Sequence, residues 1–270
     1  MKKVVYLFVL VILAGACSTE PHYVIKGKID GSDSILFLLQ KIEDGKIVTI
    51  DSALSTNGSF TMKGGAVKYP ELVQLVAANT RKATKFFLEN SEIVLTGSID
   101  SLYNATITGS KSQDEYQGFI DSNKPLSDKY SQAYKEFREA SAAGDTAKVA
   151  ELRRLFDSVD EEMKNLQKNF IKNNPKSYVS PSILESISYS LEADEIESMI
   201  NAMDTTLSSL PQMETLKKKV AVMKSVAIGQ KAPDFTLNDV NGNPVSLYSK
   251  VGPKLLLVDF WAAWCGPCRR

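Results

Sequence analysis

The sequence has few of the side chains that most often carry chemistry: its 270 residues include three cysteines and one histidine. It also has no excess of charge, because 32 lysines and arginines balance 32 aspartates and glutamates. A neutral overall charge does not favour nucleic-acid binding, so nucleic acid is not an expected partner. The hydrophobic share of 43% is that of folded proteins rather than disordered ones, and the length suggests about two domains.

No hydrophobic run in the sequence reaches the ~20 residues that a membrane-spanning helix needs. The strongest run, VVYLFVLVILA, follows Lys2 and Lys3 and is followed by the small residues Gly15 and Ala16. A basic start, a short apolar stretch and a small-residue cleavage site are the three parts of a secretory signal peptide. We therefore expect residues 1–16 to be a signal peptide and the protein to be exported.

The residues around the expected cleavage site, LAGAC, resemble a bacterial lipobox, although Leu13 lies one position further from Cys17 than in the usual pattern. In a lipobox the cysteine is lipidated and becomes the first residue of the mature protein. The resemblance implies a lipoprotein of a Gram-negative cell envelope that faces the periplasm and is anchored to the membrane through Cys17. An ordinary signal peptide followed by an unmodified cysteine is the alternative interpretation.

Short apolar or alternating runs recur over residues 23–108, at roughly the 8–12-residue spacing of an all-β sandwich or barrel. Turn residues separate the runs, and Asn57-Gly58 is the strongest hairpin signal because both residues tolerate positive φ. We expect a β-rich, sandwich-like domain over residues 17–110, with a hairpin formed by the strands on either side of Asn57-Gly58. None of its patterns indicates catalysis.

Between residues 112 and 226 the spacing of apolar residues changes from two to about 3.6, which indicates helices. The clearest helix follows Gly144 and Asp145, a helix stop and an N-cap, and runs to Pro175. An α-helical region is therefore expected over residues 111–226. Methionines recur there at helical spacing, and core packing explains them better than metal binding does. They are Met199, Met203, Met213 and Met223.

A third region is expected over residues 228–270. The stretches DFTL and PVSL read as short strands, and Asn241-Gly242 marks a turn that joins them as a hairpin. The unbroken apolar run KLLLVDFWAAW predicts a central strand buried on both faces. This run leads directly into Cys265-Gly266-Pro267-Cys268.

The segment APDFTL…DVNGNPVSL…LLLVDFWAAWCGPCR resembles the beginning of a thioredoxin-fold domain of the TlpA/ResA type, a family of exported thiol-disulfide oxidoreductases. The resemblance implies a multi-domain chain whose third part is an α/β thioredoxin-like fold, incomplete here. The remaining strands and a cis-proline facing the disulfide would have to follow Arg270, so we expect a C-terminally truncated product. The β-rich and helical regions resemble the N-terminal part, of unassigned function, of envelope lipoproteins with a C-terminal redoxin domain.

The Cys-Gly-Pro-Cys motif predicts dithiol chemistry with divided roles. At the start of a helix, Cys265 would face unpaired N–H groups and the positive end of the dipole, which favours the attacking thiolate. Cys268, one turn further, would resolve the mixed disulfide. The Gly-Pro pair resembles thioredoxin, with a potential of about −270 mV, rather than a strong oxidant at about −120 mV, and so suggests a reductant of protein disulfides.

Three neighbours of the cysteines are expected to contact the substrate protein: Trp264, Gly266 and Pro267. The family resemblance also implies that Asp259 is a buried acid that exchanges protons with Cys268. The alternative for Asp259 is a solvated residue at a strand end.

Other uses of the cysteine pair fit less well. A tetrahedral zinc site would need two further ligands, and the chain offers only Cys17 and His22, both far upstream. A structural disulfide across so small a loop would remove little entropy from the unfolded chain. Peroxiredoxin chemistry would need a Pro/Thr-containing turn before the cysteine, which WAAWCGPC lacks. We expect neither a metal nor a cofactor.

Two functional classes follow. The preferred one is a membrane-anchored thiol-disulfide oxidoreductase that reduces protein disulfides, with apocytochrome c as a candidate substrate and a membrane dithiol protein as electron donor. The other is a non-enzymatic envelope lipoprotein that binds a partner or ligand through its β-rich and helical regions, with an inactive redox segment.

Overall fold

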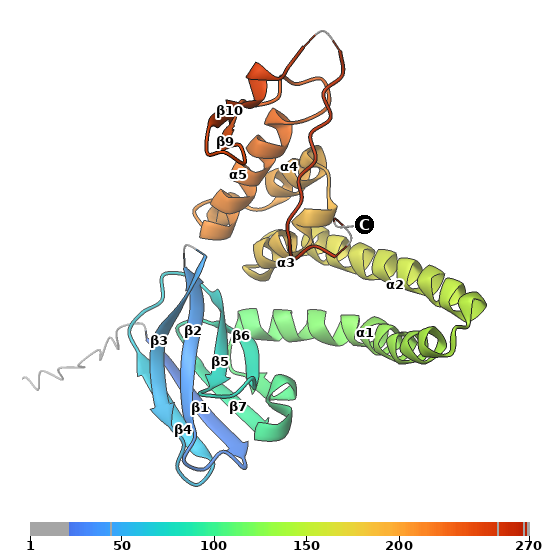
Figure 1. Ribbon diagram of the computed structural model, residues 1–270. Helices are drawn as coiled ribbons and strands as arrows, with labels where there is room; N and C mark the ends of the chain where they lie inside the picture. The colour runs from blue at the N-terminus through green and yellow to red at the C-terminus, as the bar shows by residue number, and fades with distance from the viewer. Residues whose placement is uncertain (1–21, 44, 253, 267, 269–270) are drawn as a thin grey trace, which may run out of the picture.

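The computed structural model describes residues 22–43, 45–252, 254–266 and 268. Its N-terminal part consists of two four-stranded β-sheets (Figure 1), with strand orders β4-β1-β7-β8 and β3-β2-β5-β6. Strand β1 pairs with β4 in antiparallel and with β7 in parallel orientation. The strands are β1 Tyr23–Asp30, β2 Leu36–Glu43, β3 Lys46–Leu54, β4 Ser59–Gly64, β5 Glu71–Ala77, β6 Ala83–Leu88, β7 Glu92–Ser98 and β8 Thr106–Thr108.

The two sheets bury one shared hydrophobic core. Buried and more exposed residues alternate along most strands, so that one face of each sheet contributes to this core. Phe37 of β2 stacks on Phe60 of β4 with ring centroids 4.5 Å apart, which joins one sheet to the other. The expected β-rich N-terminal region is confirmed.

The turn at Asn57-Gly58 is present, but the predicted hairpin is wrong. Both residues have positive φ, 50° and 73°, and Thr56 and Ser59 form an isolated bridge around them. The flanking strands β3 and β4 nevertheless belong to different sheets. The turn therefore carries the chain from one sheet to the other, because β3 pairs with the preceding strand β2 and β4 pairs with β1.

The central part is helical, as expected. Asp145 accepts a hydrogen bond from the Lys148 N–H group (2.9 Å) as the N-cap of the second helix, and Gly144 ends the first helix in the left-handed conformation. Met203 and Met213 are buried, and Met199 and Met223 pack against the same core. The helices are α1 Lys111–Ala143, α2 Thr146–Asn173, α3 Val179–Ile187, α4 Ala193–Ala202 and α5 Pro211–Ser225.

Strand β6 joins the sandwich to the helices. The Phe87 side chain is fully buried in the helical core, while Phe86 and Leu88 belong to the sandwich core. The Phe87 N–H group donates to Oε1 of Gln113 in α1 (3.0 Å). Glu89 accepts hydrogen bonds from the Lys111 N–H group and from another residue of the first turn of α1, each at 2.8 Å. The helix is thus attached to the sheet edge at several points.

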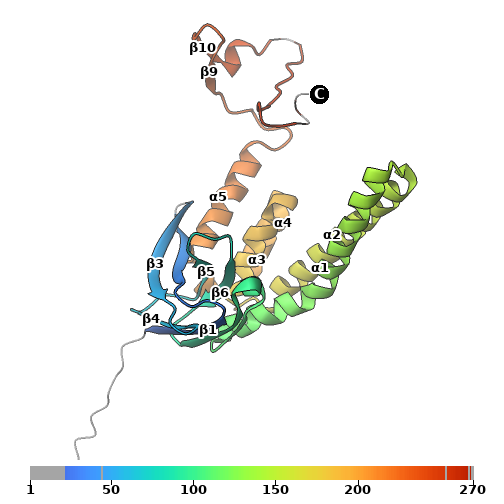
Figure 2. The same cartoon turned by 60° about the horizontal axis from the view of Figure 1, so that its bottom comes forward.

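The C-terminal part begins with the predicted hairpin. Strands β9 (Thr236–Asn238) and β10 (Pro244–Ser246) pair in antiparallel orientation, and Gly242 in their connection has a φ of 85°. A 3-10 turn, η4 Leu247–Ser249, follows. Figure 2 shows this segment extending beyond the end of α5. In the part of the chain that the structure describes, no helix is long and apolar enough to span a bilayer.

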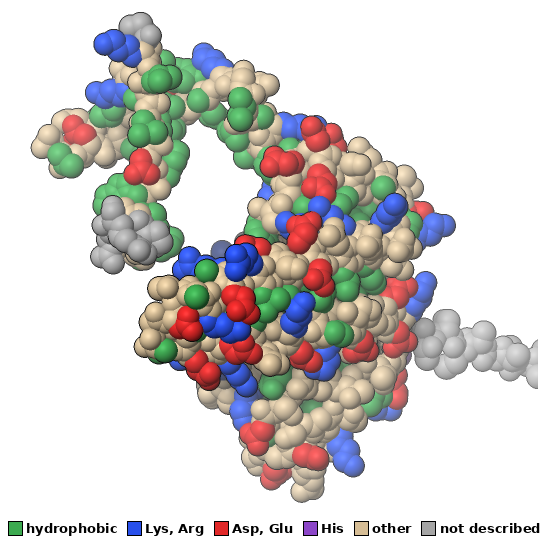
Figure 3. Space-filling model, turned by 90° about the vertical axis from the view of Figure 1, so that its right-hand side faces the viewer, with side chains coloured by type: hydrophobic (Ala, Val, Ile, Leu, Met, Phe, Trp, Pro, Cys, Tyr) green, Lys and Arg blue, Asp and Glu red, His purple; other side chains and the backbone are tan. Residues whose placement is uncertain are grey.

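The prediction of a buried central strand in KLLLVDFWAAW is wrong for this structure. The described residues between 254 and 264 form no strand, and Leu255, Leu257 and Phe260 are largely exposed. Hydrophobic side chains follow this segment along the surface in Figure 3. A strand needs neighbours for its backbone hydrogen bonds, and β9 and β10 pair only with each other among the described strands. The expected α/β thioredoxin-like arrangement is therefore not formed over the described residues.

Candidate redox site

Cys265 and Cys268 are joined by a disulfide, with their Cα atoms 5.3 Å apart. The Cys265 N–H group donates to the carbonyl oxygen of Ala262 (3.0 Å), which closes a turn immediately before the disulfide. Cys265 is half-buried and Cys268 is exposed. Cys265 was expected at the start of a helix, but in the structure it lies between turns. The close pairing of the two sulfurs thus depends on their short separation and this turn.

The residues next to the disulfide are accessible to a partner. The Trp264 side chain is 88% exposed, and Gly266 is exposed as well. Pro267 lies outside the described residues, as does Cys17, the predicted lipidation site. An exposed indole beside a disulfide offers apolar contact area to a substrate protein.

Asp259 is exposed, which contradicts its expected burial. Among the described residues, its carboxylate has no hydrogen-bond or ion-pair partner. The expectation depended on a strand with covered faces, and that strand is not formed. The structure therefore does not bring Asp259 to Cys268.

The hairpin before the disulfide has a local framework that sequence reasoning missed. Asp234 accepts hydrogen bonds from the Ser246 hydroxyl and from the Tyr248 N–H group (3.0 Å). The backbone hydrogen bond from Tyr248 is the main reason that the pKa of Asp234 is lowered. Phe235 contacts Phe260, with ring centroids 6.0 Å apart. In the sequence, only Asp234, the first residue of the stretch DFTL, signals this framework.

In the part of the chain covered by the structure, no three His, Cys, Asp or Glu side chains form a group that could hold a metal ion. The C-terminal site does contain two bonded sulfurs. A bonded pair of sulfurs with an accessible face can be attacked by an external thiolate.

Two separate segments of the chain match known protein families. Residues 228–270 match the AhpC/TSA family, and residues 23–116 match the Domain of unknown function (DUF4369). Thioredoxin-like protein YneN of Bacillus subtilis (strain 168) is 46% identical over 54 residues, which are 20% of this chain and 29% of that protein. Thiol-disulfide oxidoreductase ResA of Geobacillus thermodenitrificans (strain NG80-2) is 44% identical over 46 residues, 17% of this chain and 26% of that protein.

A thioredoxin from Alicyclobacillus acidocaldarius subsp. acidocaldarius is 83% identical over 18 residues, 7% of this chain and 17% of that protein. No solved structure matches the chain. The chain spans less than a third of the length of these curated relatives. The C-terminal segment is thus related to the thioredoxin-like redoxins, and relatives of the chain are thiol-disulfide oxidoreductases.

Proposed function

We propose that the protein is an exported, membrane-anchored thiol-disulfide oxidoreductase that reduces protein disulfides. The observation that carries the proposal is the Cys265-Gly266-Pro267-Cys268 motif, closed as a disulfide, within a segment related to thioredoxin-like redoxins. Two cysteines in bonding distance favour disulfide exchange over chemistry that uses a single reactive cysteine.

In the proposed cycle, the reduced protein supplies two electrons. The Cys265 thiolate attacks one sulfur of the substrate disulfide, forms a mixed disulfide and releases the other substrate sulfur as a thiolate. Cys268 then attacks the Cys265 sulfur, which releases the second substrate thiol and leaves the Cys265–Cys268 disulfide. A membrane dithiol protein reduces this disulfide again. Trp264, Gly266 and Pro267 contact the substrate.

Apocytochrome c, whose thiols must be reduced before haem attachment, is the candidate substrate that the TlpA/ResA resemblance suggests. The lipid on Cys17 would hold the protein on the periplasm-facing side of a Gram-negative membrane. Each buried CH₂ of a lipid contributes ~0.8 kcal/mol, so several acyl chains hold a protein firmly. Replacing Cys17 with serine should release the protein from the membrane fraction or leave its signal peptide uncleaved. Unchanged partitioning of that variant would exclude lipidation.

Insulin reduction by the purified full-length protein tests the redox proposal. The wild type should precipitate insulin B chain in the presence of dithiothreitol, and Cys265→Ser and Cys268→Ser should each lose this activity. Cys268→Ser should trap a mixed disulfide with insulin, whereas Cys265→Ser should trap none. The reverse pattern of trapping would show that the two roles are exchanged.

A wild type no more active than the Cys265→Ser variant would instead support the second function, a binding lipoprotein. The two buried cores of the β-rich and helical regions favour that alternative, because most of the ordered structure lies outside the redox segment.

A further inference from the structure

One end of the β-sandwich contains a cavity that the redox chemistry does not use. Its volume is about 310 Å³. Its walls come from the start of β1, the paired strands β2 and β3, the start of β5 and the connection between β4 and β5. Ligand cavities in proteins typically measure about 300–1,000 Å³, so this one has room for a small molecule.

Tyr23 forms one wall of the cavity and is rigidly held. Its side chain is 5% exposed, and its ring lies so close to Gly64 that a Cβ atom at position 64 would be 2.1 Å from it. The Tyr23 hydroxyl donates to Oδ2 of Asp51 (3.1 Å). Burial, with the nearby Asp51 carboxylate, raises the pKa of Tyr23 to about 12. The hydroxyl therefore keeps its proton, and its oxygen can accept a further hydrogen bond.

The connection between β4 and β5 forms another part of the wall, and Asn90 holds it in place. The Val67 N–H group donates to Oδ1 of Asn90, and Nδ2 of Asn90 donates back to the Val67 carbonyl oxygen, both at 2.8 Å. A wall that is fixed in advance does not have to be ordered when a ligand binds, which favours affinity.

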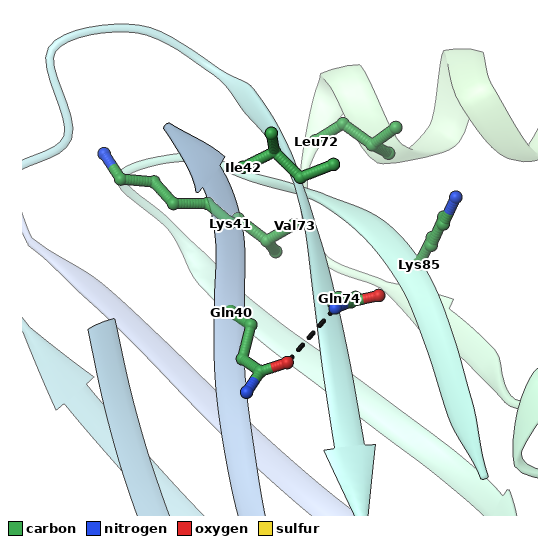
Figure 4. A pocket seen from close by; sticks show the side chains of 7 residues that line it. All are labelled: Gln40, Lys41, Ile42, Leu72, Val73, Gln74 and Lys85. Carbon is green, nitrogen blue, oxygen red and sulfur yellow. Dashed lines mark hydrogen bonds between the residues drawn. The ribbon is translucent and has the colours of Figure 1, made fainter. Parts of the chain in front are cut away.

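A lysine and a glutamate provide the polar side of the cavity. The Lys41 ammonium lies 3.6 Å from a Glu43 carboxylate oxygen and 3.7 Å from one of Glu71, both longer than a hydrogen bond. The side chains of Lys41 and Glu71 are only 24% and 21% exposed. Both groups can therefore still form hydrogen bonds with a ligand, and both are only partly exposed to solvent. Figure 4 shows a neighbouring pocket, which shares only Lys41 with this cavity; in that view the Lys41 ammonium points away from Lys85, a residue of β6.

We propose that this cavity binds a neutral, hydroxyl-rich molecule, namely a mono- or disaccharide. A hydroxyl group can accept a hydrogen bond from Lys41 and donate one to Glu71, since it combines both functions in one atom. The lining carries Lys41 and Lys68 as well as Glu71, and Glu43 lies beside Lys41, so a ligand with a net charge would meet like charges as well as opposite ones. The ring of Tyr69, which is half-buried, supplies apolar area for the C–H groups of a sugar.

Ligand titration of the purified full-length protein tests the proposal, with glucose, N-acetylglucosamine and maltose as probes and saturation-transfer NMR as the readout. At least one of the three should bind. Lys41→Met should raise its Kd at least ~10-fold, because a charged hydrogen bond is lost. Gly65→Leu should abolish binding, because position 65 lines the cavity and the leucine side chain would occupy it. The backbone tolerates this change, since φ of Gly65 is not positive and a Cβ atom there would meet nothing within 4 Å.

Lys85→Met is the matched control, since it makes the same chemical change outside the cavity and should leave the Kd unchanged. If Lys41→Met fails to fold, as judged by circular dichroism, Gly65→Leu still decides the question. Binding of none of the three sugars, equal effects of the two lysine variants, or displacement of the sugar by glycine would overturn the proposal. Cys265→Ser should bind sugar normally, so failure of the redox function does not affect this test.

Discussion

Replacing Gln113 with methionine should destabilise the protein, although methionine has nearly the same length and suits apolar surroundings better. Gln113 is 1% exposed at the start of α1, and its Oε1 atom accepts the hydrogen bond of the Phe87 N–H group. Strand β6 is the last strand of its sheet, so this N–H group has no neighbouring strand to bond on that side. The variant leaves a buried backbone donor without a partner.

An unsatisfied buried donor costs about 1–3 kcal/mol. For a folded unit of this size, each kcal/mol lowers the melting temperature by about 2–4 °C, so the expected decrease is about 2–12 °C. The Ser110 side chain still caps α1 through the backbone N–H group of residue 113 (3.0 Å), because the substitution does not alter that group. The loss therefore reports the contact between sheet and helix rather than the helix end.

Differential scanning calorimetry of the full-length protein measures the change. Gln132→Met is the control, because Gln132 is exposed on the same helix and should change stability by no more than about 0.5 kcal/mol. Hydrogen exchange provides a second readout, since the Phe87 amide should exchange faster in Gln113→Met and at the wild-type rate in Gln132→Met. Equal melting temperatures for the two variants and an unchanged Phe87 amide would refute the reasoning.

Three further predictions concern the rest of the fold. Gly109→Ala should lower the free energy of unfolding, measured in urea, by about 2–5 kcal/mol, because φ is 107° and the new Cβ atom would lie 2.0 Å from the Glu92 carbonyl oxygen. A smaller decrease than for Gly118→Ala would contradict this. The pKa of Tyr23, raised to about 12 mainly by burial, exceeds its unfolded value near 10, so its contribution to stability is complete below pH 10 and lost towards pH 12. The stability difference between wild type and Tyr23→Phe should shrink over that range, and a constant difference would disprove it. A fragment of residues 23–225 should unfold cooperatively, since it contains both buried cores; a gradual melt without protected amides would show that residues 226–270 are integral.

Several features of this protein follow from the sequence alone because the interactions that create them are local. Gly144 and Asp145 end one helix and begin the next through contacts within about four residues. The positive φ values of Asn57 and Gly58 likewise need only those two residues and their neighbours. The cysteine pair was recognisable for the same reason, since three positions separate Cys265 from Cys268 and the structure joins them.

Strand pairing was decided by the tertiary structure. No local pattern indicates that β1 pairs in parallel with β7, or that β3 and β4 belong to different sheets. The sequence likewise could not predict which core each face of β6 joins. Phe87 packs in the helical core and Phe86 in the sandwich core, although both are equally apolar. The cavity lined by Tyr23, Lys41 and Glu71 was equally hidden, because its groups come from three separate strands.

The run KLLLVDFWAAW shows the difference most directly. Its composition determines that it is apolar and suited to a buried strand, and that much is a property of the eleven residues themselves. Whether such a run becomes a strand depends on partners that offer backbone hydrogen bonds and cover its side chains. None of the described strands pairs with it, so Leu255 and Trp264 remain exposed, and Asp259 lacks the buried position that its predicted role requires.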